Sequence, residues 1–175
     1  MNWGERGSVA ARGATGTRLD VPPLLPAPSF LQVRILAVPL APTAYEAAAR
    51  ACADGGDVRK AVELLRAAAA AGGGGGAARA VFSCLARDAA ADPALALLDE
   101  LGGGWEDDVA AFALNAAARA CARAARPDDG LRLLADLKCR ALRVDTGTYD
   151  ALALACLSAG RPADSEELLE ERDYL

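Results

Sequence analysis

The sequence predicts an all-α protein made of four helix–turn–helix units, and three observations support this fold class. The chain of 175 residues is 53% hydrophobic but only 5% aromatic, and much of its apolar content is alanine, the strongest helix former. Residues 45–52 (YEAAARAC) recur as residues 114–121 (LNAAARAC), with six of eight positions identical, and again as residues 149–156 (YDALALAC). A second motif follows each copy, so the chain repeats with a period close to 35 residues.

This second motif is a small residue followed by two leucines three and four positions later, a spacing that places all three on one helical face. Its four copies begin at Ala61, Ala94, Gly130 and Ser165, in steps of 33, 36 and 35 residues. Aspartate, glycine or proline separates the two motifs of each unit, as expected where one helix ends and another begins. We therefore predict helix pairs at residues 43–54 and 57–71, 77–88 and 91–101, 108–125 and 127–141, and 146–159 and 162–173.

The cysteines indicate packing rather than chemistry. Three of the five, Cys52, Cys121 and Cys156, occupy one repeat position beside small residues, which let neighbouring helices approach closely. The chain has no histidine and no closely spaced cysteine pair, so we expect neither a zinc site nor a disulfide framework.

Residues 1–41 differ from the rest of the chain. They hold most of the nine prolines and four arginines against two acidic residues, and they show no helical period. We expect a disordered tail there, and its arginine-rich, acid-poor start is also loosely like an organellar transit peptide. Residues 42–175 then form the repeat domain.

Charge divides between these two parts. The whole chain carries a formal charge of −5, made of +2 in residues 1–41 and −7 in residues 42–175. An acidic body attracts a polyanion poorly. A local basic groove is still consistent with the sequence, since Arg50 and Arg119 share a repeat position and Arg87 and Arg123 are nearby.

The fourth unit resembles a pentatricopeptide repeat along its whole length, through residues 145–152 (DTGTYDAL) and 156–171 (CLSAGRPADSEELLEE). Residues 43–66 are similar, whereas the second unit is degenerate. The aromatic and glycine pattern of tetratricopeptide repeats is not found. The resemblance covers residues 42–175 and implies a right-handed α-solenoid of about four repeats that binds single-stranded RNA. It also implies a role in organellar RNA metabolism, in a mitochondrion or chloroplast, with the cytoplasm as the alternative.

In that family one base is read by the polar residue after the tyrosine position together with the residue just before the next repeat. Another residue near the start of the first helix sandwiches the base. The resemblance assigns the reading pair to Asn115 and Asp145, a combination similar to the uridine-preferring one, and the sandwiching role to Phe112. The positions equivalent to Asn115 in the other units are Glu46, Arg79 and Asp150. A carboxylate at two of these places would put negative charge where RNA should lie.

Two other function classes remain open. Helical repeats present concave surfaces that also bind proteins, so a protein-interaction scaffold without RNA binding is the alternative. An enzyme is not expected, because the usual general base, histidine, is missing.

The five glycines at 72–76 lack the lysine and hydroxyl residue of a phosphate-binding loop, so we predict a loose loop there. We expect no cofactor, no small-molecule substrate and no membrane span, since the longest uncharged runs are shorter than the ~18–20 apolar residues that a bilayer requires.

Overall fold

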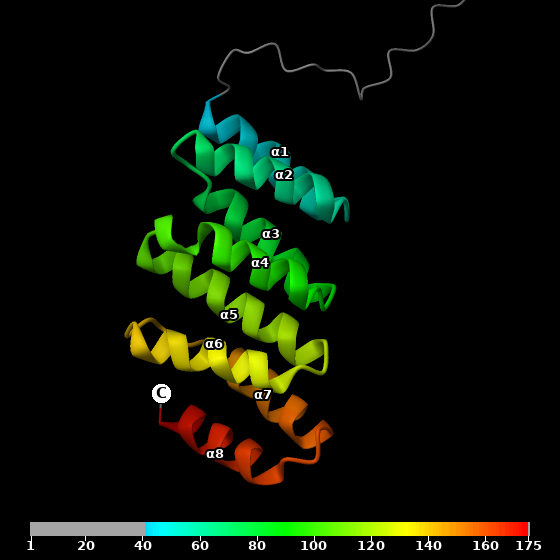
Figure 1. The fold of residues 1–175 in the computed structure, drawn as a ribbon, viewed down its shortest axis with the longest axis vertical. Helices are drawn as coiled ribbons and strands as arrows, with labels where there is room; N and C mark the ends of the chain where they lie inside the picture. Colours follow the sequence, from blue (N-terminus) through cyan, green and yellow to red (C-terminus); the bar gives the residue numbers. More distant parts are fainter. Residues whose placement is uncertain (1–40, 175) are drawn as a thin grey trace, which may run out of the picture. The chain divides into compact units, whose positions relative to one another are not determined.

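The structure, a computed structural model, describes residues 41–174, which form eight α-helices, one short 3₁₀ helix and no strand (Figure 1). This part of the chain is all-α, as the sequence predicts, and each predicted helix pair has its counterpart. The predictions for residues 1–40 lie outside the described residues. In chain order the elements are α1 (Pro42–Asp54), α2 (Val58–Ala70), α3 (Gly75–Arg87), α4 (Ala91–Leu101), η2 (Gly102–Gly104), α5 (Asp107–Arg123), α6 (Pro127–Cys139), α7 (Thr146–Ser158) and α8 (Pro162–Asp173).

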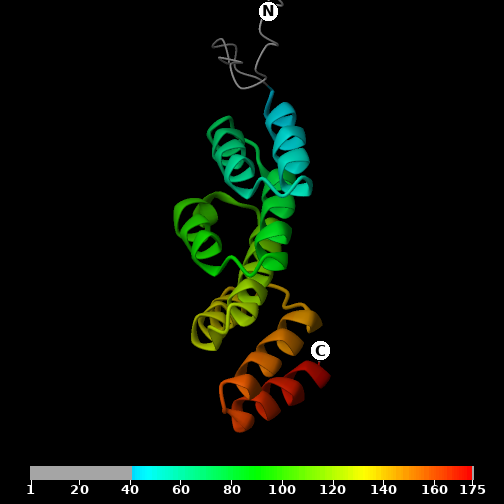
Figure 2. The same ribbon diagram turned by 90° about the vertical axis from the view of Figure 1, so that its right-hand side faces the viewer.

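Odd- and even-numbered helices have different neighbours. The odd helices, here called first helices, pack on one another in the order α1, α3, α5, α7. The even helices, here called second helices, pack on the first helix of their own unit, and α2, α4 and α6 also contact the next first helix. Figures 1 and 2 show the units following one another from α1 to α8. The first helices therefore form a continuous row through the described part of the chain.

The turn inside each unit has one geometry, repeated four times. The residue at its apex has a positive φ, namely Gly56, Ala89, Ala125 and Gly160, with φ of 80°, 54°, 57° and 75°. The backbone N–H of the following residue donates to the carbonyl of the residue five positions before it, at 2.9 Å in all four turns. This six-to-one bond is that of a Schellman motif, which ends a helix by satisfying a free carbonyl.

The core is built from the two predicted motifs. The first motif contributes Ala49, Ala118, Cys121 and Cys156, all without exposed surface. The small residues that open the second motif are also buried, at 0% exposed for Ala61 and Ala94 and 1% for Ser165. Gly130 is the fourth member, and a Cβ atom there would clash with Cδ2 of Leu152. Small side chains thus allow the close approach between helices that the sequence predicts.

Two arginines join consecutive units through the starts of their second helices. Arg126 bonds Asp92 of the unit before it and Asp129 of its own unit. Arg161 does the same one unit later, with Asp128 and Asp164, both at 2.5 Å. These pairs are partly exposed, so each stabilises modestly, but their recurrence fixes the register between neighbouring units.

The glycine run 72–76 is not the loose loop that we expected. Helix α3 begins inside it at Gly75, and Gly74, with a φ of 114°, stands at its N-cap. A Cβ atom on Gly73 would lie 2.6 Å from Cβ of Pro42, and one on Gly76 would lie 2.7 Å from Oε2 of Glu46. The run lacks side chains because the start of α3 passes close to α1.

Candidate nucleic-acid interface

Asn115, the residue predicted to read a base, is buried at 1% exposed. Its Nδ2 donates to the carbonyl oxygens of Ala111 at 2.8 Å and Arg143 at 2.9 Å. Its Oδ1 accepts the backbone N–H of Asp145 at 2.9 Å and the hydroxyl of Thr148 at 2.8 Å. These four bonds use the full capacity of an amide. Base recognition by Asn115 remains a prediction, and it would require this network to open.

The equivalent side chains of the first two units also reach forward to the next unit. Oε1 of Glu46 accepts the backbone N–H of Gly74 at 2.9 Å, just before α3. Nη2 of Arg79 donates to Oδ2 of Asp108 at 2.5 Å, in the first turn of α5. The position that reads bases in pentatricopeptide repeats is thus occupied here, in three units, by contacts that tie one first helix to the start of the next.

The other predicted site residues lie around this junction. Asp145 brings its backbone to Asn115, and its half-exposed carboxylate accepts from Nη1 of Arg119 at 3.3 Å. Phe112 is half-buried, and the guanidinium of Arg79 lies 5.3 Å from its ring centroid. Asp150 is exposed on α7 and accepts from Nη1 of Arg172, on α8, at 2.6 Å. The structure therefore brings Asn115 and Asp145 together, and it pairs Asp150 with α8.

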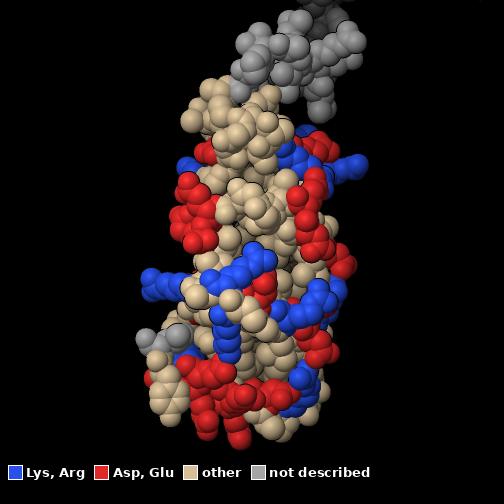
Figure 3. Space-filling model, turned by 60° about the vertical axis from the view of Figure 1, so that its left-hand side comes forward, with Lys and Arg blue, Asp and Glu red and all other residues tan. Residues whose placement is uncertain are grey.

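Formal charge is divided unequally between the two sets of helices. The first helices carry −1, +2, 0 and −1 from α1 to α7, so their net charge is zero. The second helices carry +2, −3, −1 and −5 from α2 to α8, so their net charge is −7. Figure 3 shows acidic side chains gathered at the end of the molecule where α8 lies. The net negative charge of residues 42–175 thus lies on the second helices, and the row of first helices has no net charge.

Five arginines follow the first helices, and we call them the arginine row: Arg50, Arg79, Arg87, Arg119 and Arg123. The sequence predicted four of them for a basic groove, whereas Arg79 was predicted only at the position equivalent to Asn115. Arg50, Arg79 and Arg87 line a shared hollow of about 310 Å³ between α1 and α3. In residues 41–174, Arg50 forms no ion pair, while Arg79 and Arg87 pair with exposed carboxylates. Exposed pairs of this kind are worth at most about 1 kcal/mol, so a phosphate can displace them.

A second basic hollow lies where the first helices continue to α7. Its volume is about 930 Å³, and its lining includes Arg119, Lys138 and Arg143 together with Asp145 and Tyr149. The ammonium of Lys138 lies 5.7 Å from the ring centroid of Tyr149. Arg119 pairs with Asp145, and Lys138 pairs with Glu171 on α8. These pairs are partly exposed, so the three cations and the aromatic ring offer contacts both to a phosphate and to a base.

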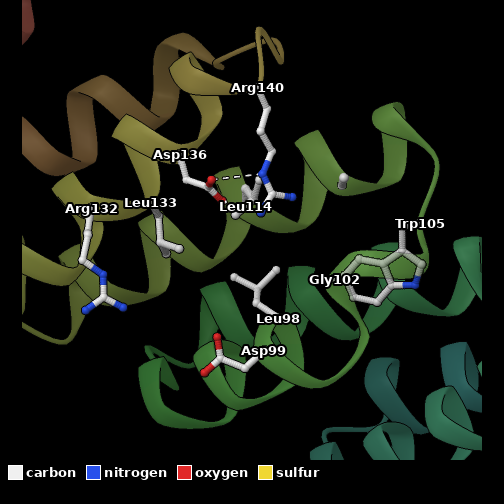
Figure 4. Close-up of a pocket in the computed structure, with 10 residues that line it drawn as sticks. Leu98, Asp99, Gly102, Trp105, Leu114, Arg132, Leu133, Asp136 and Arg140 are labelled. Atoms are coloured by element: carbon white, nitrogen blue, oxygen red, sulfur yellow. Dashed lines mark hydrogen bonds and ion pairs between the residues drawn. The ribbon is translucent and has the colours of Figure 1, made fainter.

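A third hollow, of about 320 Å³, lies among α4, α5 and α6 (Figure 4). Leu98, Trp105 and Leu133 supply apolar lining, and an exposed pair, Asp136 with Arg140, stands at its side. Trp105 packs edge-on against Phe82, with ring centroids 5.6 Å apart. This hollow belongs to the acidic side of the protein, where α4 and α6 do not close on one another, so we do not assign RNA to it.

Other chemistry has little support in residues 41–174. No three histidine, cysteine, aspartate or glutamate side chains lie close enough there to hold a metal ion. Burial raises the pKa of the Cys121 and Cys156 thiols, so both stay protonated and unreactive at neutral pH. No helix in this range is long and apolar enough to cross a bilayer.

Comparison with known proteins does not test the pentatricopeptide resemblance. No family model matches the chain, and no curated protein matches it. The geometry and the charge of residues 41–174 are therefore the basis for a proposed function.

Proposed function

We propose that residues 42–175 form a right-handed α-solenoid of pentatricopeptide-like repeats that binds single-stranded RNA along the arginine row. One observation supports this above the others: all of the net negative charge lies on the second helices, while the first helices are neutral and hold five arginines. A polyanion approaching the first helices therefore meets cations at spacings set by the repeat.

The proposed binding mode relies on phosphate contacts more than on base reading. The side chains at the base-reading position of the first three units already bond the next unit. Sequence preference should accordingly be weak. Affinity should depend strongly on salt, since each phosphate neutralised on a single strand adds about 0.7 to the slope of log K against log salt.

To test this, labelled single-stranded RNA, either U-rich or A-rich, is titrated with the protein at two salt concentrations, and binding is measured by fluorescence anisotropy. The double variant Arg50→Gln, Arg87→Gln removes two cations from the arginine row. The matched control, Arg59→Gln with Arg132→Gln, removes two exposed cations from second helices. We expect the first variant to lose about tenfold in affinity and about 1.4 in salt slope, and the control to lose much less.

Equal losses in both variants would show only unspecific attraction and would contradict the arginine row as the site. Salt-insensitive binding, or none at micromolar protein, would contradict the proposal as a whole.

A protein-interaction scaffold is the second candidate, and the saturated amide of Asn115 favours it, because a base reader should have free hydrogen-bonding groups. On this alternative the same first-helix surface binds a protein. This alternative would be supported if the chain binds a purified protein partner and shows no RNA binding in the titration above.

The organellar location implied by the resemblance also remains a proposal, to be checked by fusing residues 1–41 to a fluorescent protein.

A further inference from the structure

Each first helix presents one face to the unit before it, and this face is buried in three units. In α7 it consists of Thr148, Tyr149, Leu152, Ala155 and Cys156, each 7% exposed or less. The equivalent residues of α3 and α5 are buried to the same extent. These positions thus form the receiving side of every junction between consecutive units in residues 41–174.

In α1 nothing within residues 41–174 buries the same positions. They are Ala44, Tyr45, Ala48, Ala51 and Cys52, which we call the start face, and none of them is buried. Ala44 and Ala51 are exposed, although their counterparts in α7, Thr148 and Ala155, are 0% and 7% exposed. The start face therefore has the composition of a receiving side, but no helix of the described part of the chain buries it.

At the other end of the described chain, the side of α7 that faces away from α5 exposes large apolar residues. The position that meets the next unit is alanine in the first three units, Ala53, Ala86 and Ala122, at 2%, 6% and 8% exposed. In α7 it is Leu157, which is 52% exposed, and Leu154 beside it is 66% exposed. We call Leu154 and Leu157 the end face. They are two of the three large apolar side chains that stand exposed in residues 41–174.

Size and charge of the two faces match each other. At the junction of α5 and α7, small Ala122 and large Leu152 belong to one apolar cluster. In a junction of the end face with the start face, large Leu157 would take the position of small Ala122, and small Ala48 would take the position of large Leu152. The large and small side chains would thus exchange sides while the pair keeps a similar total volume. The adjoining second helices are also complementary, since α8 carries −5 and α2 carries +2. Contact between two end faces would instead bring two α8 helices of −5 together, which like-charge repulsion disfavours.

We propose that the chain associates head to tail, with the end face of one copy on the start face of a second copy. This contact is heterologous and does not close on itself, so it produces a series of oligomers rather than one dimer. Each added copy extends the arginine row by the same repeat, and the contact does not depend on RNA. The contact involves one unit of each copy, and we expect an affinity in the micromolar range.

Sedimentation of the full chain, kept reduced, over a range of protein concentrations tests this proposal. Leu157→Asp disables the end face, and Ala51→Glu disables the start face. Each variant alone should remain monomeric, with association weakened at least about tenfold. An equimolar mixture should form a one-to-one dimer and nothing larger, because each variant supplies the face that the other lacks. Ala96→Glu, which adds a charge at an exposed position of α4, is the matched control and should associate like the parent chain.

Three results would overturn the proposal. The parent chain could stay monomeric at every concentration. Ala51→Glu alone could still form a single dimer, as an interface between two end faces would give. The mixture of variants could remain monomeric while circular dichroism shows both folded. Because no RNA is present in these measurements, their outcome is independent of the proposed RNA binding.

Discussion

Asn115 illustrates how one side chain can hold three backbone segments together. Its amide bonds its own helix, the loop between α6 and α7, and the start of α7. The sequence places a polar residue at this repeat position in all four units, which is why the pentatricopeptide resemblance assigns it to base reading. Its burial could not be predicted locally, because three of its four partners lie 28 to 33 residues away.

Replacing Asn115 by alanine should destabilise the fold by about 2–4 kcal/mol, since buried hydrogen-bonding groups are left without partners. Urea unfolding followed by circular dichroism measures the change. Asp150→Ala, at the equivalent and exposed position of α7, is the control and should change the free energy of unfolding by less than about 1 kcal/mol. Similar stability of the two variants would refute the structural role of Asn115.

Ser165 presents the reverse case. It is 1% exposed, and its Oγ has no hydrogen-bond partner in the described part of the chain. Alanine occupies the same position in the first two units, as Ala61 and Ala94. Ser165→Ala should therefore raise the free energy of unfolding by about 1 kcal/mol. A lower thermal midpoint for this variant would mean that the hydroxyl is bonded in solution.

At the scale of the element, the turn inside each unit decides where the first helix ends. Breaker residues predicted these turns well, because glycine and proline act locally and recur with the repeat. The second and third turns carry alanine at the positive-φ position, as Ala89 and Ala125. There the fold, and not the residue's own preference, imposes the conformation.

The arginine bridges between units were not predicted, because the aspartate partners in the preceding unit are more than 30 residues distant. The only local signal is that an arginine followed by proline recurs at the repeat spacing, at Arg126 and Arg161.

Ala125→Gly should therefore stabilise the protein by about 0.5–1 kcal/mol, because it removes the strain of a left-handed alanine. Gly160→Ala should destabilise it by about 1 kcal/mol for the same reason, and a Cβ atom there would meet nothing within 4 Å. Thermal unfolding of the two variants should give shifts of opposite sign. Shifts of the same sign would contradict the turn geometry.

At the scale of the whole molecule, the first helices have no net charge, and the second helices together carry the net negative charge. The total charge of residues 42–175 alone counts against RNA, whereas its distribution over the fold does not. The charges can be read from the sequence but the side on which they lie cannot, since arginine and acidic residues occur in both first and second helices. Packing of the first helices on one another, together with the acidity of α4 and α8, creates the difference.

The most direct test of the proposed RNA binding is to map the contact surface by amide NMR during a titration with short single-stranded RNA. We expect salt-sensitive shifts at and next to the arginine row, on α1, α3 and α5 and in the loop before α7. The outer turns of α4 and α8 should stay unchanged. Shifts concentrated on the second helices, or none at saturating RNA, would contradict the proposal that the first helices are the RNA-binding surface.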